Sequence, residues 1–447
     1  MRRLPALALV LAAALPAAAA DGPLSVVPPP PGAGAADPAV ERVAENARAA
    51  LALAYSPRGL APLLRVHAER DEAADLHLLA AAYQAVLDKT STHPRLRPWA
   101  ALLLADVERA RGRNVRAREA LAPLSFLGNF RVLGGFDNEG KGGCDTDFGP
   151  ESHLDLAATY NAGGRELRWH ALPVHPTDGF VDLGAAVHPR HDVVAYALAF
   201  LEAERDMQVA LWLGASGAHR LWVNGERVSS ADRYHPAALD QSGVNVRLRK
   251  GTNRVLLKVC HAGGPLGFVL RQERVAGGGP LAREVAPDGL PPLPPVRNEK
   301  GARPTSATAL PTLASLLQAQ QRASPEDPQW MGDLATVLAG SGAFDEASPE
   351  DAALAQKAAD AAPDDAALQL LAADRKRDDF NARRALLDRA LAAAPDHPGA
   401  TAALAAHLLQ RDQAWQALSL LGPHVSRNPG HVRARLLHAQ ALERTGQ

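Results

Sequence analysis

Hydrophobic positions between Pro38 and about Leu124 recur every three to four residues, which is the period of an amphipathic helix. The pattern is carried by Val40, Val43 and Ala44, by Leu78, Leu79, Tyr83 and Val86, and by Leu102, Leu103, Val107 and Ala110. Breaks at His93-Pro94 and at Arg111-Gly112-Arg113 separate these stretches. We expect four or five antiparallel helices, forming a helical array over residues 38–125.

The period changes to two after Phe126. Residues 244–249 alternate aliphatic and polar side chains, as a half-buried antiparallel strand does. Residues 193–201 and 207–213 are more uniformly apolar, as central strands are. Asn224-Gly225 is a hairpin signal, and the turn at 250–253 joins 244–249 to 254–260. These signals predict a two-sheet β-sandwich over residues 126–275.

Residues 276–304 are rich in Gly and Pro and predict a linker, after which the helical period returns with a repeat. The prolines of SPEDP, APDD, APDH and NPGH are separated by 38, 32 and 34 residues: Pro325, Pro363, Pro395 and Pro429. A period near 34 is typical of stacked helix pairs, which we expect over residues 305–447. Residues 431–446 look like one more first helix, either a solvating cap or a sign that the chain is the front part of a longer polypeptide.

These units resemble tetratricopeptide repeats. In the unit from Ala400 to Pro429, matches to the family pattern are Leu404, Ala405, Ala417, Leu421 and Pro429. The unit before it matches at Leu387, Ala390 and Pro395, whereas the first-helix Trp and Tyr of the pattern are missing. The resemblance implies a superhelix whose concave face holds a protein or peptide segment.

The middle region resembles the galactose-binding-like β-sandwich, as in the sugar-binding domain of glycoside hydrolase family 2. The resemblance is carried by LWVNGERV (221–228), VRLRKGTNRVLLKV (246–259) and GFVLRQE (267–273). It implies a jelly-roll sandwich that could bind glycans. The expected fold class is therefore a multidomain α and β protein, with helical-repeat arrays flanking an antiparallel β-sandwich.

The stretch GGFDNEGKGGCDTDFGPE (134–151) resembles a segment of large exported bacterial proteins, which carry it before tetratricopeptide repeats and a transglutaminase-like peptidase region. If this chain belongs with them, the catalytic part lies beyond Gln447.

The first twenty residues have the pattern of an export signal. Arg2 and Arg3 precede the apolar run 4–15, and small residues at 18–20 precede Asp21. The run is short for a membrane anchor, and the Pro-rich stretch 21–37 after it predicts an extended linker. We expect a periplasmic or secreted protein with no membrane span after signal removal.

The net charge bears on which classes of partner the protein binds, and the cysteine content bears on a possible disulfide. With 48 Lys and Arg against 49 Asp and Glu, the net charge of −1 disfavours a nucleic-acid partner or a membrane-surface partner. Cys144 and Cys260 are the two cysteines, and outside the cytoplasm they could form a disulfide. Two unpaired thiols are the alternative, because sequence alone does not show that their Cα atoms approach.

Candidate ligand-binding residues lie in the sandwich. Trp169, Trp222 and Tyr234 could stack on sugar rings, with hydroxyl partners at Asn224, Arg233 and Asp240. Packing of the aromatic rings over sheet faces or edges is the alternative. If all three rings are buried, the glycan hypothesis loses its basis.

A second candidate is the acidic loop. Asp137, Glu139, Asp145 and Asp147 could hold Ca²⁺, although their spacing fits no EF-hand and a solvated loop is the simpler interpretation. No nucleophile elbow, zinc-protease motif, phosphate loop or dinucleotide fingerprint occurs in the sequence, and no cofactor is expected.

The sequence therefore predicts an exported, non-enzymatic scaffold. Its repeats would bind protein partners, and its sandwich would serve as a spacer or accessory module. Carbohydrate binding through the sandwich is the first alternative. The second is that the chain is the front region of a transglutaminase-like enzyme.

Overall fold

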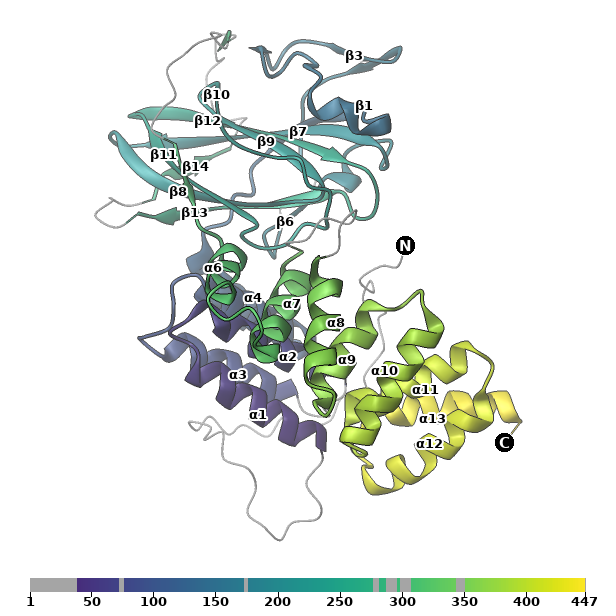
Figure 1. Ribbon diagram of the computed structural model, residues 1–447. Coiled ribbons are helices and arrows are strands. Elements are labelled where there is room, and N and C mark those ends of the chain that lie inside the picture. Colours follow the sequence, from purple (N-terminus) through teal and green to yellow (C-terminus); the bar gives the residue numbers. More distant parts are fainter. Residues whose placement is uncertain are drawn as a thin grey trace.

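A computed structural model describes residues 38–71, 76–172, 176–275, 281–286, 296–297, 307–342 and 350–446 (Figure 1). The predicted export signal 1–20 and linker 21–37 lie outside the described residues, as does most of the predicted linker 276–304. Within the described ranges, no helix combines the length and hydropathy that a membrane crossing requires.

The described residues of the first helical region form five α-helices, within the predicted four or five. They are α1 Pro38–Ala52, α2 Leu60–Ala68, α3 Leu76–Asp88, α4 Arg97–Ala110 and α5 Asn114–Leu121. Their buried faces follow the three-to-four spacing, as Val43, Ala47 and Ala50 show on α1. Gly112 follows α4 with a φ of +76°, a conformation that glycine adopts without a steric penalty, and it separates α4 from α5.

The middle region is a sandwich of two antiparallel sheets, which confirms the predicted fold class. The larger sheet has the order β10-β9-β12-β7-β1-β5, with β14 also paired to β7, and the smaller has the order β16-β11-β8-β13-β6. The larger sheet contains β1 Arg131–Asp137, β5 His170–Ala171, β7 Val193–Ala203, β9 Ala218–Val223, β10 Glu226–Ala231, β12 Gly251–His261 and β14 Arg283–Val285. The smaller contains β6 Phe180–Asp182, β8 Met207–Ala215, β11 Ser242–Leu248, β13 Gly267–Arg274 and β16 Thr308–Leu310.

Local turn chemistry sets the strand connections. Asn224 (φ +52°) and Gly225 (φ +89°) form the turn between β9 and β10, where both central residues need positive φ. The turn that ends at Gly251 connects β11 to β12, but these strands belong to different sheets, so the chain crosses the sandwich here. Along β11, Val244, Val246 and Leu248 are buried and alternate with more exposed residues, as the sequence predicts.

The sandwich is covered on both outer faces. Apolar side chains from the two inner faces form one core between the sheets. The outer face of the larger sheet lies under the segment 138–171, which contains short strands: β2 His153–Leu154, paired with β15 Val296–Arg297, and β3 Tyr160–Ala162, paired with β4 Arg165–Leu167. The smaller sheet lies next to the helices, with Trp212 of β8 fully buried (Figure 1).

The last region contains the predicted helical repeats. Its helices are α6 Leu313–Gln321, α7 Pro328–Ser341, α8 Glu350–Ala361, α9 Ala366–Arg375, α10 Phe380–Ala393, α11 Pro398–Gln410, α12 Ala414–Arg427 and α13 Val432–Thr445. Pro363, Pro395 and Pro429 lie in the turns before α9, α11 and α13, so each opens a new helix pair. The Asp365 side chain accepts hydrogen bonds from the Ala367 and Leu368 amides and caps α9.

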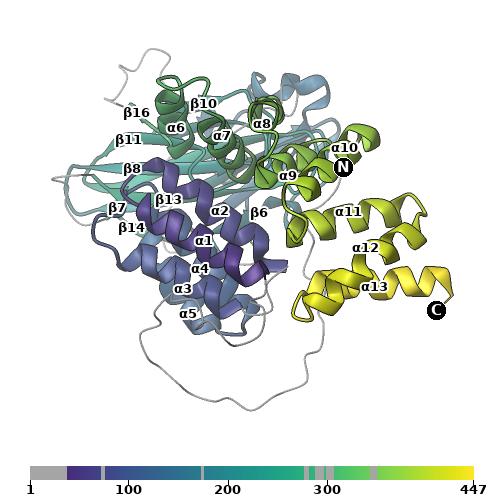
Figure 2. The ribbon, with the colours of Figure 1, turned by 60° about the horizontal axis from the view of Figure 1, so that its bottom comes forward.

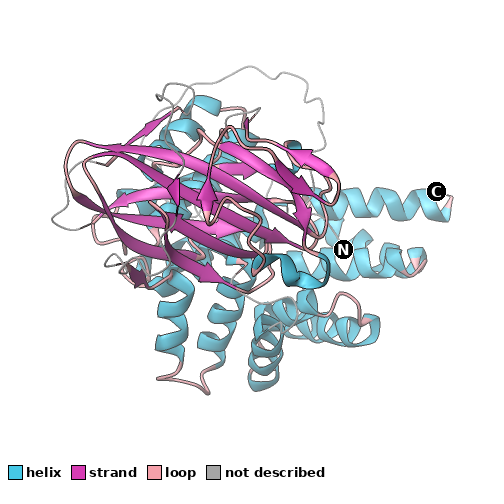
Figure 3. Cartoon of the chain, turned by 90° about the horizontal axis from the view of Figure 1, so that it is seen from above, coloured by secondary structure: helices cyan, strands magenta, loops and turns pink. Residues whose placement is uncertain are grey.

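The first two helices of this region join the N-terminal helices in one core. Leu313 and Leu317 of α6 and Leu334 of α7 belong to the same apolar cluster as α1–α4. Asp333 of α7, 3% exposed, pairs with Arg58 and with Arg65 of α2, the latter at 2.5 Å. Figure 2 shows α6 and α7 beside α2, with α11–α13 extending away, and Figure 3 shows helices extending past one side of the sandwich.

Candidate functional site

The three aromatic residues predicted to bind sugars lie together but are buried. Trp169, Trp222 and Tyr234 are 7%, 8% and 8% exposed and belong to one cluster on the outer face of the larger sheet. The segment 138–171 covers this face. The expected open aromatic cleft is therefore filled by the protein itself, and these rings are packing residues.

Two of the three polar residues predicted to accompany these rings make contacts elsewhere in the fold. Asn224 stabilises the β9–β10 turn, since its Oδ1 accepts from the Arg254 amide at 3.0 Å and its Nδ2 donates to Asn253 at 2.8 Å. Asp240 is 6% exposed and pairs with Arg271, while Arg233 is exposed. These residues do not converge with the aromatic rings on one ligand.

The acidic loop uses its carboxylates for local hydrogen bonds. Asp137 accepts from the Glu139 amide at 3.0 Å, Asp147 accepts from the Gly149 amide at 2.8 Å, and Asp145 pairs with Arg220 at 2.9 Å. Across the described segments, no group of three or more His, Cys, Asp or Glu residues is placed to hold a metal ion. The loop therefore offers no assembled Ca²⁺ site.

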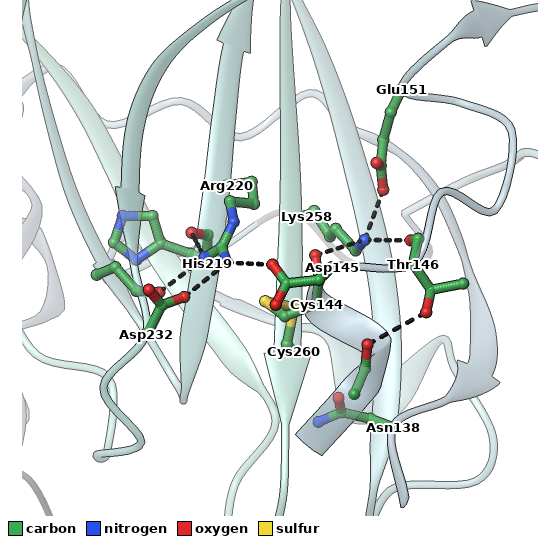
Figure 4. A network of polar contacts seen from close by, with 12 residues as sticks. Asn138, Cys144, Asp145, Thr146, Glu151, His219, Arg220, Asp232, Lys258 and Cys260 are labelled. Atoms are coloured by element: carbon green, nitrogen blue, oxygen red, sulfur yellow. Dashed lines mark hydrogen bonds and ion pairs between the residues drawn. A yellow bond between two sulfur atoms is a disulfide. The ribbon is translucent and has the colours of Figure 1, made fainter. Parts of the chain in front are cut away.

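A disulfide and a buried lysine attach this loop to the larger sheet (Figure 4). Cys144 and Cys260 are joined, with an S–S distance of 2.14 Å and a Cα–Cα distance of 5.5 Å. Lys258 of β12 is fully buried, and its Nζ donates to the carbonyls of Cys144 (3.0 Å) and Thr146 (2.7 Å) and to Glu151 (2.6 Å). The sequence analysis missed this role of Lys258, whose only signal is a lone lysine within the apolar run 255–260 of β12.

The electrostatics of this network fit a structural role. Burial lowers the pKa of Lys258, while the charge and hydrogen bond of Glu151 act in the opposite direction. Arg220 of β9 donates to Asp145 and also pairs with Asp232 at 2.6 Å (Figure 4). Since the Lys258 ammonium has three acceptors for its three protons, it has none left for a substrate. The network pins the covering segment rather than forming an active site.

The exposed apolar residues point instead to the helical repeats. Six large hydrophobic side chains are exposed among the described residues, and four of them lie on α10–α13. These four are Phe380 (39%), Trp415 (63%), Val432 (54%) and Leu436 (59%), and the other two are Tyr55 and Val115. Val432 and Leu436 are one turn apart on α13 and so share a face. We call these four residues the apolar repeat residues.

Phe380 also forms part of a mixed aromatic and cationic group, which we call the α10–α11 corner: Phe380, Arg383, His407 and Arg411. The Phe380 and His407 ring centroids are 5.8 Å apart, and the Arg411 guanidinium carbon lies 5.3 Å from the Phe380 centroid. Aromatic rings beside arginine are common at protein interfaces. The C-terminal repeats therefore carry the candidate binding surface.

Comparisons with known proteins assign no family. No protein-family model matches the chain, and no curated protein matches it. Among solved structures, the MamA protein is similar over 30% of this chain and 72% of its own, with 17% identity and a TM-score of 0.27. A mutant of MamA is similar over 30% of this chain and 77% of its own, with 16% identity and a TM-score of 0.26. TM-scores this low carry no argument, so the function of this chain has to be inferred from its own surface.

Proposed function

We propose that this chain is a protein-interaction scaffold whose C-terminal repeats, of the tetratricopeptide type, bind a segment of a partner protein. The observation that carries the proposal is the concentration of exposed large apolar side chains on α10–α13. Stacked helix pairs expose extended surfaces that serve for association, and four of the six exposed large apolar side chains among the described residues lie on these helices. The proposal assigns no cofactor and no catalytic residue.

In this proposal the β-sandwich acts as a rigid mount. Its smaller sheet lies against the helices, with the Arg95 guanidinium 3.9 Å from the Trp212 ring centroid. Its larger sheet is covered by the segment tied down through Cys144 and Lys258. Carbohydrate binding would need a surface other than the predicted one, because Trp169, Trp222 and Tyr234 are buried.

Export remains part of the proposal. The Cys144–Cys260 disulfide fits an oxidising compartment, where such bonds persist. We predict that the mature protein begins at Asp21, because the small residues at 18–20 suit signal cleavage. Expression in a bacterium, fractionation and N-terminal sequencing test this. A chain recovered from the cytoplasm with its first twenty residues intact would contradict export.

The apolar repeat residues give the test of binding. Trp415→Ser combined with Leu436→Ser is expected to weaken partner binding by about 30-fold or more, since a central interface Trp often contributes about 2 kcal/mol or more. The full chain captures a partner from an extract of the producing cells. The affinity of the purified partner is then measured by surface plasmon resonance.

The matched control replaces exposed apolar residues outside the repeats. Tyr55 and Val115 are 64% and 59% exposed, so Tyr55→Ser with Val115→Ser removes similar apolar area from the N-terminal helical region, outside the repeats. This control should bind as the wild type does. Equal binding by both double variants would show that the C-terminal repeats are not the interface.

A further inference from the structure

Two arginines of the α10–α11 corner have no carboxylate partner among the residues that the structure describes. Phe380 and Arg383 are three residues apart on α10, and His407 and Arg411 are four apart at the end of α11, so each pair shares a face. The ring of Phe380 lies near both His407 and Arg411, which brings the two faces together. Within the described residues, neither Arg383 nor Arg411 has a carboxylate at ion-pair distance, in contrast to the neighbouring pair Arg384–Asp388 at 2.8 Å.

Two buried donor or acceptor atoms in the corner have no hydrogen-bond partner. The Nε of Arg383 is shielded from solvent and bonds to nothing, and so is the Nδ1 of His407, whose side chain is only 4% exposed. A buried polar atom without a partner is costly, and other atoms of this kind also occur among the described residues. Because the Nε of Arg383 is enclosed by the protein, a ligand from solution would meet the terminal nitrogens of its guanidinium. The corner offers such a ligand the charge of two arginines that no carboxylate of the described residues approaches to ion-pair distance, unlike Arg384.

The charges around the corner favour an anionic ligand. Burial lowers the pKa of Arg383, Asp374 raises it, and the charges of Arg377 and Arg433 lower it further. Burial also lowers the pKa of His407, as do the charges of Arg383, Arg384 and Arg411, against Asp388. Asp388 is already bound by Arg384. An added anion between Arg383 and Arg411 would thus be attracted by both guanidinium groups.

We infer that the partner segment held by the repeats is acidic, with an Asp or Glu carboxylate between Arg383 and Arg411 and an apolar side chain against Phe380. Carboxylates match the fork of guanidinium donors, and their hydrogen bonds to arginine are roughly twice as strong as neutral ones. Trp415, in the first turn of α12, follows Arg411 by four residues and is 63% exposed. This inference rests on the proposed function, because it names the chemistry of the segment bound at the same repeats.

A random peptide library displayed on phage tests the inference with the immobilised full chain. The enriched peptides should contain Asp or Glu together with an apolar residue. Arg383→Gln and Arg411→Gln should each lower the affinity for the best synthetic peptide by about tenfold or more, because each removes a charge-assisted hydrogen bond. Arg389→Gln is the matched control, because Arg389 is an exposed arginine on the same helix, and it should leave affinity unchanged.

An independent readout is the His407 imidazole, followed by NMR. Its pKa should rise when the acidic peptide binds, because the carboxylate offsets the nearby arginine charges. The inference is overturned if enriched peptides lack acidic residues, or if Arg383→Gln and Arg411→Gln bind as tightly as Arg389→Gln. If neutral peptides bind, and Trp415→Ser combined with Leu436→Ser lowers the affinity of the chain for them, the proposed function stands although the acidic segment is wrong. A library that yields no binder to the repeats would overturn both.

Discussion

Asp240→Asn is expected to lower the free energy of unfolding by up to about 3 to 5 kcal/mol, because it breaks a buried ion pair and leaves Arg271 only its second, more exposed partner, Glu273. Asp240 Oδ1 and Oδ2 accept from Arg271 Nε at 2.8 Å and Nη2 at 2.6 Å. The two side chains are 4% and 2% exposed, so water cannot replace the lost carboxylate. Asparagine tolerates the positive φ of 56° at this position, which keeps backbone strain out of the comparison.

The Asp240–Arg271 pair also joins the sandwich to the helices. Arg271 pairs with Glu273 at 2.9 Å, and Glu273 pairs with Arg95 from the N-terminal helical region at 3.0 Å. Arg95 in turn lies over the buried Trp212 ring. Urea unfolding can therefore be monitored by tryptophan fluorescence, and the midpoint of the transition should report the lost free energy of unfolding.

Two comparison variants make the Asp240 result interpretable. Asp206→Asn removes one side of an exposed pair with Arg247 in the same sandwich, where water replaces the partner, and should cause no comparable loss. Asp240→Asn combined with Arg271→Met removes both charges and should recover part of the stability. A single variant as stable as the wild type would show that the buried charge is compensated in another way.

Lowering the pH from 6.5 to 4.5 is expected to cost about 2 kcal/mol of stability for each of two buried histidines, His219 and His397. Burial lowers the pKa of His219 to about 4, with smaller effects from His235 and Arg220. Burial lowers the pKa of His397 to about 3, with a smaller effect from Arg42. Below pH 6.5 the unfolded chain binds protons that the folded chain does not, so stability present above 6.5 falls as the pH drops.

The geometry at His397 explains why the folded state disfavours its protonation. His397 is 3% exposed, and its Nδ1 accepts a hydrogen bond from the Ala400 amide as the N-cap of α11. A protonated Nδ1 could not accept this bond. His397→Asn should keep a side-chain cap and remove the proton uptake, since asparagine is a favoured N-cap residue.

Denaturant unfolding at a series of pH values measures the effect. The His397→Asn variant should lose about 2 kcal/mol less than the wild type between pH 6.5 and 4.5. His153→Asn is the control, because His153 is exposed and keeps its contact with water on folding. Identical pH slopes for the wild type and His397→Asn would contradict a buried neutral imidazole.

Elements specified by neighbouring residues were predictable from the sequence. Asn224-Gly225 supplies the positive φ of a hairpin turn, and the alternation at 244–248 marks one buried face. The prolines Pro363, Pro395 and Pro429 lie in the turns between helix pairs, where the missing N–H of proline costs no helical hydrogen bond. In each case the cause lies within a few residues of the effect. The α-β-α order of the fold followed from these local signals.

The candidate binding site depended on contacts between distant segments. Alternation places Trp222 on one face of a strand, but only the packing of residues 138–171 shows that this face is covered. Lys258 gained its role from carbonyls 112 and 114 residues earlier in the chain. Asp333 joins the two helical regions across 268 and 275 residues.

Arg383 shows most clearly the difference between what local sequence predicts and what packing decides. Several aspartates lie close to it in the sequence, so the sequence alone would suggest that one of them pairs with its guanidinium. Only the folded packing of α10 against α11 reveals that its Nε is buried without one, next to His407 and Phe380. The sequence by itself determined which helices and strands form, because local periodicity and turn residues select them. Which charges are paired and which faces stay open was decided by the tertiary structure, because burial is a property of long-range contacts.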